Sequence, residues 1–455
     1  MPRLRLPHAI TLLVACTILA ALLTYVLPAG QFDRRDDPET GRRVVVAGTY
    51  HRVPAHPIGP FQTMVAIPDG IIDAASVIAF VFLVGAAFTV VDQTGALRDG
   101  IEWLARRLGD RQLWAIPIVS LAFAAGGALE HMQEEIVGLV PVLLVLARRL
   151  GFDDLTAVMM SIGAAAVGAA FSPIDPFSVG IAQKVAHVTQ LSGGAYRSIF
   201  LAIALVLWIA GTMRHARRTH QRRPSAAGGS ASQGTPESPH RFNSRRLVVL
   251  GVVALTFVIF VYGVAALGWD FDQEAALFFI MAIVTGLIGG LGVGGTADAF
   301  IDGLRSMAYA ALLIGFARSI SVVMEQGLII DTVVQGLAAP LAGFPVAVAG
   351  VGMMVVQAAI HVPVPSTSGQ AVLTLPVFAP VADLIHMSRQ VAVLAYQYGA
   401  GICELITPTN GALMAILAAA GLRYEQWLRS TGWLLAALVA LGAASIVIAV
   451  AIGLR

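Results

Sequence analysis

Ionisable side chains stand inside several long apolar segments of this chain, where burying a charge is costly and indicates a function. Five of them are acids: Glu130, Glu134, Glu135, Asp175 and Glu404. Only one arginine, Arg318, lies at similar depth in an apolar run, so the acids are in excess. This excess predicts a bound cation, which is a substrate ammonium or guanidinium group, a sodium ion or a proton. We expect Arg318 either to hold a substrate carboxylate or to pair with a buried acid.

His131 precedes Glu134 and Glu135 at helical spacing, which leaves several interpretations open. The two acids are either site residues or the solvated face of a loop. A lone histidine is more often a hydrogen-bonding partner than a proton switch, although its charge changes near neutral pH. The trio is also a weak metal-ligand pattern, since no His-Glu-x-x-His motif occurs.

Two proline-containing polar segments lie late in long apolar runs. They are Ser172-Pro173-Ile174-Asp175-Pro176 and Thr407-Pro408-Thr409-Asn410-Gly411. Proline removes a backbone donor and interrupts a helix, and the freed backbone groups are tolerated in lipid when they line an enclosed cavity or bind an ion. One such segment alone would favour a simple kink repaired by Ser or Thr. Two of them at matched positions favour a binding site between discontinuous helices.

The predicted site joins these two breaks to two polar patches, 130–135 and 363–370. The substrate- or ion-binding residues that we predict are Glu134, Glu135, Ser172, Asp175, Ser366, Thr367, Ser368, Gly369, Gln370, Glu404, Thr407, Thr409, Asn410 and Arg318. A sodium site is predicted at Ser172, Asp175, Ser368 and Asn410. No catalytic residue is predicted, and no cofactor is expected except Na+ or H+ as a coupling ion.

The composition indicates that lipid is the solvent for most of the chain. Of its 455 residues 57% are apolar and only 12% are charged, with a mean hydropathy of +0.79. A soluble protein of this length needs more charge to cover its surface. Cys16 and Cys403 are far apart in apolar segments, so no disulfide framework is indicated. We therefore predict an all-α polytopic membrane protein.

The apolar windows predict about nine spans, two re-entrant hairpins and two discontinuous helices. The windows are 9–28, 71–95, 113–149, 155–182, 198–213, 247–267, 275–296, 306–326, 345–385, 388–420 and 432–453. Windows 113–149 and 345–385 exceed one crossing, so each is a hairpin or two full spans. With hairpins, the positive-inside rule keeps the arginine-rich loops in the cytoplasm, with the N-terminus inside and the C-terminus outside. The first window is read as a retained span rather than a signal peptide.

The two halves of the chain match at one constant offset. Pro141 falls on Pro376, Ser172-Pro173 on Thr407-Pro408, Asp175 on Asn410, and Glu135 on Gln370. Prolines and polar residues are rare in such a chain, so their alignment without a gap is informative. The charge count starts one half inside and the other outside, which predicts inverted repeats.

The predicted division has four parts. They are a first repeat at 1–213 with hairpin 113–149 and broken span 155–182, a basic disordered cytoplasmic linker at 214–246, an extra span at 247–267, and a second repeat at 268–455 with hairpin 345–385 and broken span 388–420. The linker is arginine-rich and contains a Pro/Ser/Gly run, which favours a flexible connector. Loop 29–70 is expected outside the membrane.

Several of these segments are similar to those of a known family. Gly126-Gly127-Ala128 with Glu134-Glu135, the run 367–376 around Ser368-Gly369-Gln370, and the run 389–399 resemble the YfcC-like basic amino-acid antiporters, which are grouped with the anaerobic C4-dicarboxylate carriers in the ion-transporter superfamily. The resemblance covers all but the linker and loop 29–70. It implies an inverted-repeat ion-transporter fold, a dimeric scaffold and elevator-type transport. Glu130-His131-Met132-Gln133 departs from the smaller residues expected there, so selectivity differs.

The leading hypothesis is a secondary transporter, not an enzyme, in a bacterial inner or plasma membrane. It would move a small polar solute, with basic amino acids favoured by the acid excess, by exchange or by Na+ or H+ coupling. The alternatives are a C4-dicarboxylate or other organic-anion carrier, and, in another class, an intramembrane metalloenzyme. A channel would not explain two opposed broken spans. The expected partners are the solute, the bilayer and a second copy in a homodimer; no nucleic acid is expected.

Overall fold

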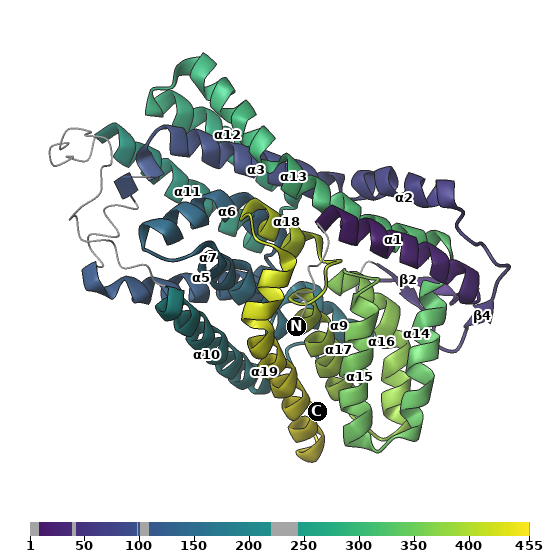
Figure 1. The fold of residues 1–455 in the computed structure, drawn as a ribbon. Coiled ribbons are helices and arrows are strands. Elements are labelled where there is room, and N and C mark those ends of the chain that lie inside the picture. Colours follow the sequence, from purple (N-terminus) through teal and green to yellow (C-terminus); the bar gives the residue numbers. More distant parts are fainter. Residues whose placement is uncertain (1–8, 39–41, 98, 101–108, 220–243, 455) are drawn as a thin grey trace, which may run out of the picture.

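Helices make up most of the computed structural model, which describes residues 9–38, 42–97, 99–100, 109–219 and 244–454 (Figure 1). Seven of the described helices are long and apolar enough to cross a membrane. They are α1 (Ala9–Val26), α3 (Ala75–Gln93), α5 with its preceding turn (Gln112–Glu130), α10 (Gly194–Thr219), α12 (Phe271–Gly289), α13 (Gly292–Gln326) and α19 (Tyr424–Ala451). The predicted polytopic helical class is confirmed in this form, and the exact count of spans stays a prediction.

The longest helix is α13, with 35 residues. It runs along one side of the molecule and packs against α1, α2 (Pro60–Asp73), α3, α12 and α18 (Gly411–Ala419) (Figure 1). The apolar window 306–326 covered only its second part. The first turns were missed because Asp298, Asp302 and Arg305 make them polar, and the helix there is largely exposed.

Each polar patch lies between two consecutive helices. Patch 130–135 joins α5 (Ala115–Glu130) to α6 (Glu134–Arg149), and patch 363–370 joins α15 (Val346–His361) to α16 (Thr367–Leu384). Helix α5 stops because His131 adopts a left-handed conformation with φ 54°. Helix α16 begins at Ser366, whose side chain accepts a hydrogen bond from the Gly369 amide, as N-cap serines do.

The two proline-containing segments interrupt helices in both halves. α7 (Asp154–Val158), the π-helix η2 (Met159–Gly163) and α8 (Ala164–Ala170) run together, and after the break come the π-helix η3 (Pro176–Gly180) and α9 (Ile181–Val185). In the second half the break separates α17 (Arg389–Glu404) from α18. A Cβ atom at Gly168 would lie 2.1 Å from the Ala124 carbonyl oxygen, so only glycine lets α8 approach α5 this closely.

The ends of the predicted linker are helical, which corrects its boundaries. α10 continues to Thr219 and α11 (Ser244–Leu267) begins at Ser244, so residues 214–219 and 244–246 belong to helices. The charged residues at these helix ends made them look like part of the linker in the sequence. Arg246, for example, belongs to α11 and pairs with Asp99 at 2.7 Å. The rest of the predicted disordered segment, 220–243, lies outside the described residues.

Loop 29–70 contains four short strands and the start of α2. Strand β1 (Gly30–Gln31) pairs antiparallel with β4 (His51–Arg52), and β2 (Arg34–Asp37) pairs antiparallel with β3 (Arg42–Val45). Helix α2 already begins at Pro60. We call residues 29–38 and 42–59 the clasp, because they reach from the end of α1 across α14 (Ile330–Ala338) to α16.

Candidate functional site

At the first break, side chains of the interrupted segment accept hydrogen bonds from its own backbone amides. Ser172 Oγ donates to the Ala128 carbonyl at 2.6 Å and accepts the amides of Ile174 and Asp175 at 3.0 and 2.8 Å. Asp175 then caps η3, accepting the Phe177 amide at 2.8 Å. The break therefore holds a fully buried carboxylate at the start of a new helical turn, where the helix dipole stabilises negative charge.

The second break has the same plan with an amide in place of the acid. Asn410 Oδ1 accepts the Leu413 amide at 3.1 Å and so caps α18. Its Nδ2 donates to the Glu404 carbonyl at 3.1 Å and to Gln133 Oε1 at 3.3 Å. Asn410 thus connects the break in the second half to the polar tip of the first half.

His131 joins the two halves directly. Its Nδ1 lies 2.6 Å from Asp175 Oδ2, and its Nε2 lies 3.1 Å from Glu404 Oε1. Thr367 Oγ1, at the start of α16, is 3.0 Å from His131 Nε2 and donates to Glu404 Oε1 at 2.7 Å. An imidazole with protons on both nitrogens donates to both carboxylates. The four side chains come from both tips and both breaks, so this cluster fixes the relative position of all four.

Glu404 is the centre of this cluster. The second oxygen of its carboxylate accepts a short hydrogen bond from Gln133 Nε2. On its other side, His361 Nε2 lies 3.9 Å from Glu404 Oε1. Gln370 holds this histidine, with its Oε1 2.8 Å from His361 Nδ1, and donates to the Gln357 carbonyl at 2.7 Å. The buried charge of Glu404 is therefore surrounded by donors.

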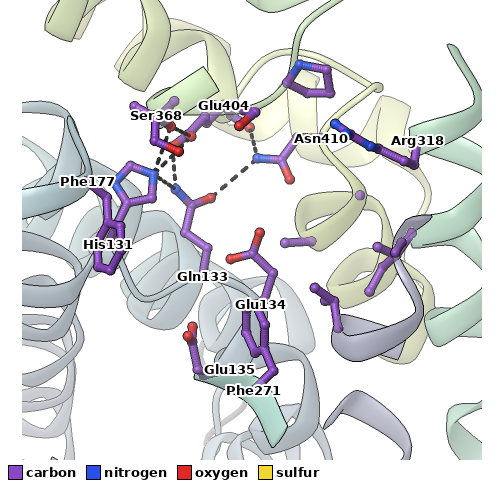
Figure 2. Close-up of a pocket in the computed structure, with 18 of the residues that line it drawn as sticks. His131, Gln133, Glu134, Glu135, Phe177, Phe271, Arg318, Ser368, Glu404 and Asn410 are labelled. Carbon is purple, nitrogen blue, oxygen red and sulfur yellow. Dashed lines mark hydrogen bonds and ion pairs between the residues drawn. The ribbon is translucent and has the colours of Figure 1, made fainter. Parts of the chain in front are cut away.

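A cavity of about 490 Å³ opens next to this cluster. Figure 2 shows Glu404, Ser368 and Asn410 on one side of it and Glu134 and Glu135 on the other. The remaining acids of its wall are Glu130, Glu274, Asp73 and Asp270.

Two of the cavity acids have a buried oxygen without a partner. Glu135 Oε2 and Glu274 Oε2 accept no hydrogen bond in the described part of the chain. Both residues come from helices of opposite halves, α6 and α12, and Glu274 is only 3% exposed. An unpaired buried carboxylate is costly, and either a proton or a bound cation would remove that cost.

The positive groups of the cavity are Arg42 and Arg318. Arg318 donates through Nε to Asp73 in a short ion pair, and its side chain remains 34% exposed. Arg318 therefore forms an ion pair in this conformation, but its partner Asp73 is 47% exposed and is not the buried acid that we expected. Arg42 reaches the cavity from the clasp and donates to Ser368 Oγ at 2.9 Å.

Most of the predicted site residues line this cavity, and the others support it. The cavity is lined by Glu134, Glu135, Ser366, Thr367, Ser368, Glu404, Thr409, Asn410 and Arg318. Ser172, Asp175 and Gln370 lie behind it in the hydrogen-bond network described above. Thr407 bonds Thr409 at 2.7 Å, and Gly369 lines a second cavity of about 430 Å³.

The predicted sodium residues already have protein partners in this conformation. Asp175 Oδ2 accepts Ser178 Oγ at 2.7 Å in addition to its contact with His131, and Ser368 accepts Arg42. Among the described residues, no group of three His, Cys, Asp or Glu side chains is arranged to hold a metal ion. The sodium site stays a prediction.

Three functional-looking residues were missed in the sequence. Glu274 was placed in water with its acidic neighbours, yet it shares the buried face of α12 with Phe278 and Met281, at spacings of four and seven. Arg42 lies in the predicted loop 29–70, and no role in the site was predicted for it. Arg197 is fully buried, donating to Gln397 Oε1 at 2.9 Å, so it and not Arg318 is the deepest arginine of the described chain. Helical spacing was the signal available for Glu274.

A polytopic helical protein whose interrupted helices and polar tips enclose one charged cavity belongs to the class of membrane transporters. A family match supports this class: the family described as "DcuC: C4-dicarboxylate anaerobic carrier" matches residues 6–451. The chain therefore belongs to the DcuC family of C4-dicarboxylate anaerobic carriers.

Two curated relatives cover nearly the whole chain. One, from Escherichia coli (strain K12), is named "Putative basic amino acid antiporter YfcC" and is 31% identical over 473 aligned positions, covering 94% of this chain and 93% of that protein. A protein of Haemophilus influenzae is 28% identical, covering 98% and 97%. The resemblance to YfcC-like proteins is confirmed.

Two solved transporter structures are also similar. The YdaH transporter of Alcanivorax borkumensis shares 18% identity with a TM-score of 0.45 and covers 98% of this chain and 99% of that one. MtrF of Neisseria gonorrhoeae shares 17% identity with a TM-score of 0.39 and covers 99% and 96%.

Proposed function

We propose that this protein is a secondary active transporter of basic amino acids, working by exchange or by coupling to Na+ or H+. The observation that carries this proposal is the pair of buried, unpartnered carboxylate oxygens of Glu135 and Glu274 in a cavity that Glu130 and Glu134 also line. Such a wall attracts a guanidinium or ammonium group and repels a dicarboxylate. The name of the relative YfcC points to the same substrate class.

A C4-dicarboxylate carrier is the second candidate, favoured by the family description. The cavity of such a carrier needs at least two positive groups, which neutralise the two carboxylates of the solute. Arg318 is already neutralised by Asp73, which leaves Arg42 as the cation of the wall without an ion-pair partner in the described chain. The acid excess therefore favours a cationic solute.

Exchange in proteoliposomes tests the two candidates against each other. Vesicles loaded with arginine should accumulate labelled arginine and ornithine by counterflow, whereas neutral amino acids, a dipeptide and succinate should compete weakly. Repeating the assay with a sodium gradient, a pH gradient or neither identifies the coupling ion. Counterflow of succinate without that of any amino acid would replace our proposal by the dicarboxylate carrier.

We also propose an elevator mechanism in a homodimer in a bacterial inner membrane, with the N-terminus in the cytoplasm and the C-terminus outside. The positions of the arginine-rich segments support this orientation, and the family resemblance supports the mechanism and the dimer. A reporter that is active only in the cytoplasm should be active when it is fused to the N-terminus. A reporter that is active only outside the membrane should be active when it is fused to the C-terminus. The same compartment for both ends would contradict the odd number of spans.

A further inference from the structure

The clasp is held firmly to the second half of the chain. Asp331 on α14, which is 3% exposed, accepts the Phe32 amide and the Arg34 guanidinium, both at 2.8 Å. Tyr50 OH and Thr332 Oγ1 lie 2.8 Å apart. These contacts place the two strand pairs of the clasp beside the cavity.

Strand β3 contacts the start of α16. Val44 is buried in a cluster with Ala371 and Leu375, which lie about one turn apart near the start of α16. Two residues earlier, Arg42 opens β3 and points to the first turn of the same helix, where it bonds Ser368. The register of β2 and β3 thus places a guanidinium at the cavity wall.

The unpartnered acids of the cavity and Arg42 lie at different ends, and Glu404, which lies at the same end as Arg42, already accepts hydrogen bonds from Thr367 and Gln133 and lies 3.1 Å from His131 Nε2. The acids Glu134, Glu135 and Glu274 come from α6 and α12, while Arg42 lies at the tip of α16. Figure 2 shows Ser368, the partner of Arg42, on the opposite side from Glu134 and Glu135. In the described part of the chain, Arg42 forms no ion pair; its hydrogen-bond partner is the neutral Ser368 hydroxyl, and Asp37 is the residue opposite it in the β2–β3 register.

The start of α16 adds to the attraction of this end for an anion. The amides of Thr367 and Ser368 are the first two of the helix and have no intrahelical acceptor. They are positively polarised by the helix dipole, and a guanidinium beside them can bind a carboxylate through two parallel hydrogen bonds. A serine hydroxyl is a weaker partner for arginine than a carboxylate, so a solute can displace it.

We propose that Arg42 binds the α-carboxylate of the transported solute, so that the cavity selects molecules with a carboxylate at one end and a cationic group at the other. This inference rests on the proposed function, because it assumes that the acid cluster receives the cationic group. It assigns a specificity role to a residue of the clasp, outside the helices that form the breaks and tips. Amines that lack a carboxylate would be poor substrates despite their charge.

Competition between arginine and agmatine, its decarboxylated analogue, tests this role. In wild-type vesicles, agmatine should inhibit labelled arginine uptake about tenfold to a hundredfold less well than unlabelled arginine does, which is the contribution of one charge-assisted contact. Arg42→Gln should raise the KM for arginine by a similar factor and make arginine and agmatine nearly equal competitors. Arg42→Lys should restore part of the preference, since it keeps the charge without the bidentate geometry.

Arg35→Gln is the matched control, because Arg35 is an exposed arginine on β2 of the same strand pair. It should leave the KM and the preference unchanged. The size-exclusion profile of Arg42→Gln in detergent should match that of wild type, which excludes misfolding as the cause.

The possible failures are distinguishable. If wild-type vesicles exchange arginine but Arg42→Gln keeps the wild-type KM and the wild-type preference over agmatine, the role of Arg42 is wrong and the proposed function stands. If wild-type vesicles exchange no cationic amino acid at all, the proposed function itself fails. An Arg42→Gln variant that loses arginine and agmatine transport to the same degree would also overturn a carboxylate-specific role.

Discussion

Glu404→Gln should lower the rate of arginine exchange about a hundredfold or more at equal amounts of protein in the vesicles. The carboxylate of Glu404 accepts from Gln133, Thr367 and His131 and links the second break to both tips. A glutamine turns one of its oxygens into an NH2 group, which then faces a donor. Breaking such a buried charged network costs about 3–5 kcal/mol, and the geometry of the whole site depends on it.

Glu425→Gln is the control for this change, because it removes the same charge from an ion pair outside the cavity, in which the Arg429 side chain is 59% exposed and that of Glu425 13%. Glu425 bonds Arg429 at 2.5 Å one helical turn away on α19, an arrangement worth little to stability. Its exchange rate should equal that of wild type. Exchange by Glu404→Gln within about threefold of wild type would mean that the cluster around His131 is not needed for transport.

Glu135→Gln should weaken arginine binding without destabilising the protein. Its Oε2 is buried and unpartnered near other acids, so removing the charge lowers repulsion in the empty cavity while it removes a partner for the bound cation. We expect the affinity for arginine to fall about tenfold to a hundredfold. Binding by calorimetry and thermal unfolding in the same detergent measure the two effects side by side.

Glu274→Gln provides an internal comparison for this prediction, since Glu274 Oε2 is unpartnered in the same way. In both variants the affinity for arginine should fall, while the unfolding temperature stays constant or rises. A drop in unfolding temperature together with unchanged affinity would assign these acids a structural role and would remove the cationic-solute argument.

The sequence was sufficient to place the interruptions of the helices. Proline beside Ser, Thr, Asp or Asn in an apolar run has few structural solutions, and α8 and α17 do stop just before Ser172 and Thr407. The polar tips were located for the same reason. Their matched spacing in the two halves was visible without a structure, but the orientation of the halves in a bilayer is still a prediction.

The contacts between distant segments could not be predicted from one sequence. Nothing near Arg42 indicates that the clasp folds back onto α16, because this depends on burial of Val44 and on the bond to Ser368, more than three hundred residues along the chain. His131 was recognised as a hydrogen-bonding residue, but its two acidic partners come from both halves. The acid Glu274 was assigned to the water phase because charge counting ignores which face of a helix a residue occupies.

The length of α13 has a mechanical consequence. At 1.5 Å per residue its 35 residues extend about 52 Å, whereas the hydrocarbon layer is about 30 Å thick. The helix therefore either leans steeply or protrudes well into water. Its last residue, Gln326, contacts the clasp through its carbonyl oxygen, 3.1 Å from His56 Nδ1. One continuous helix thus connects the exposed, charged start of α13 to the clasp. A change in the tilt of α13 would therefore also move the end that contacts the clasp.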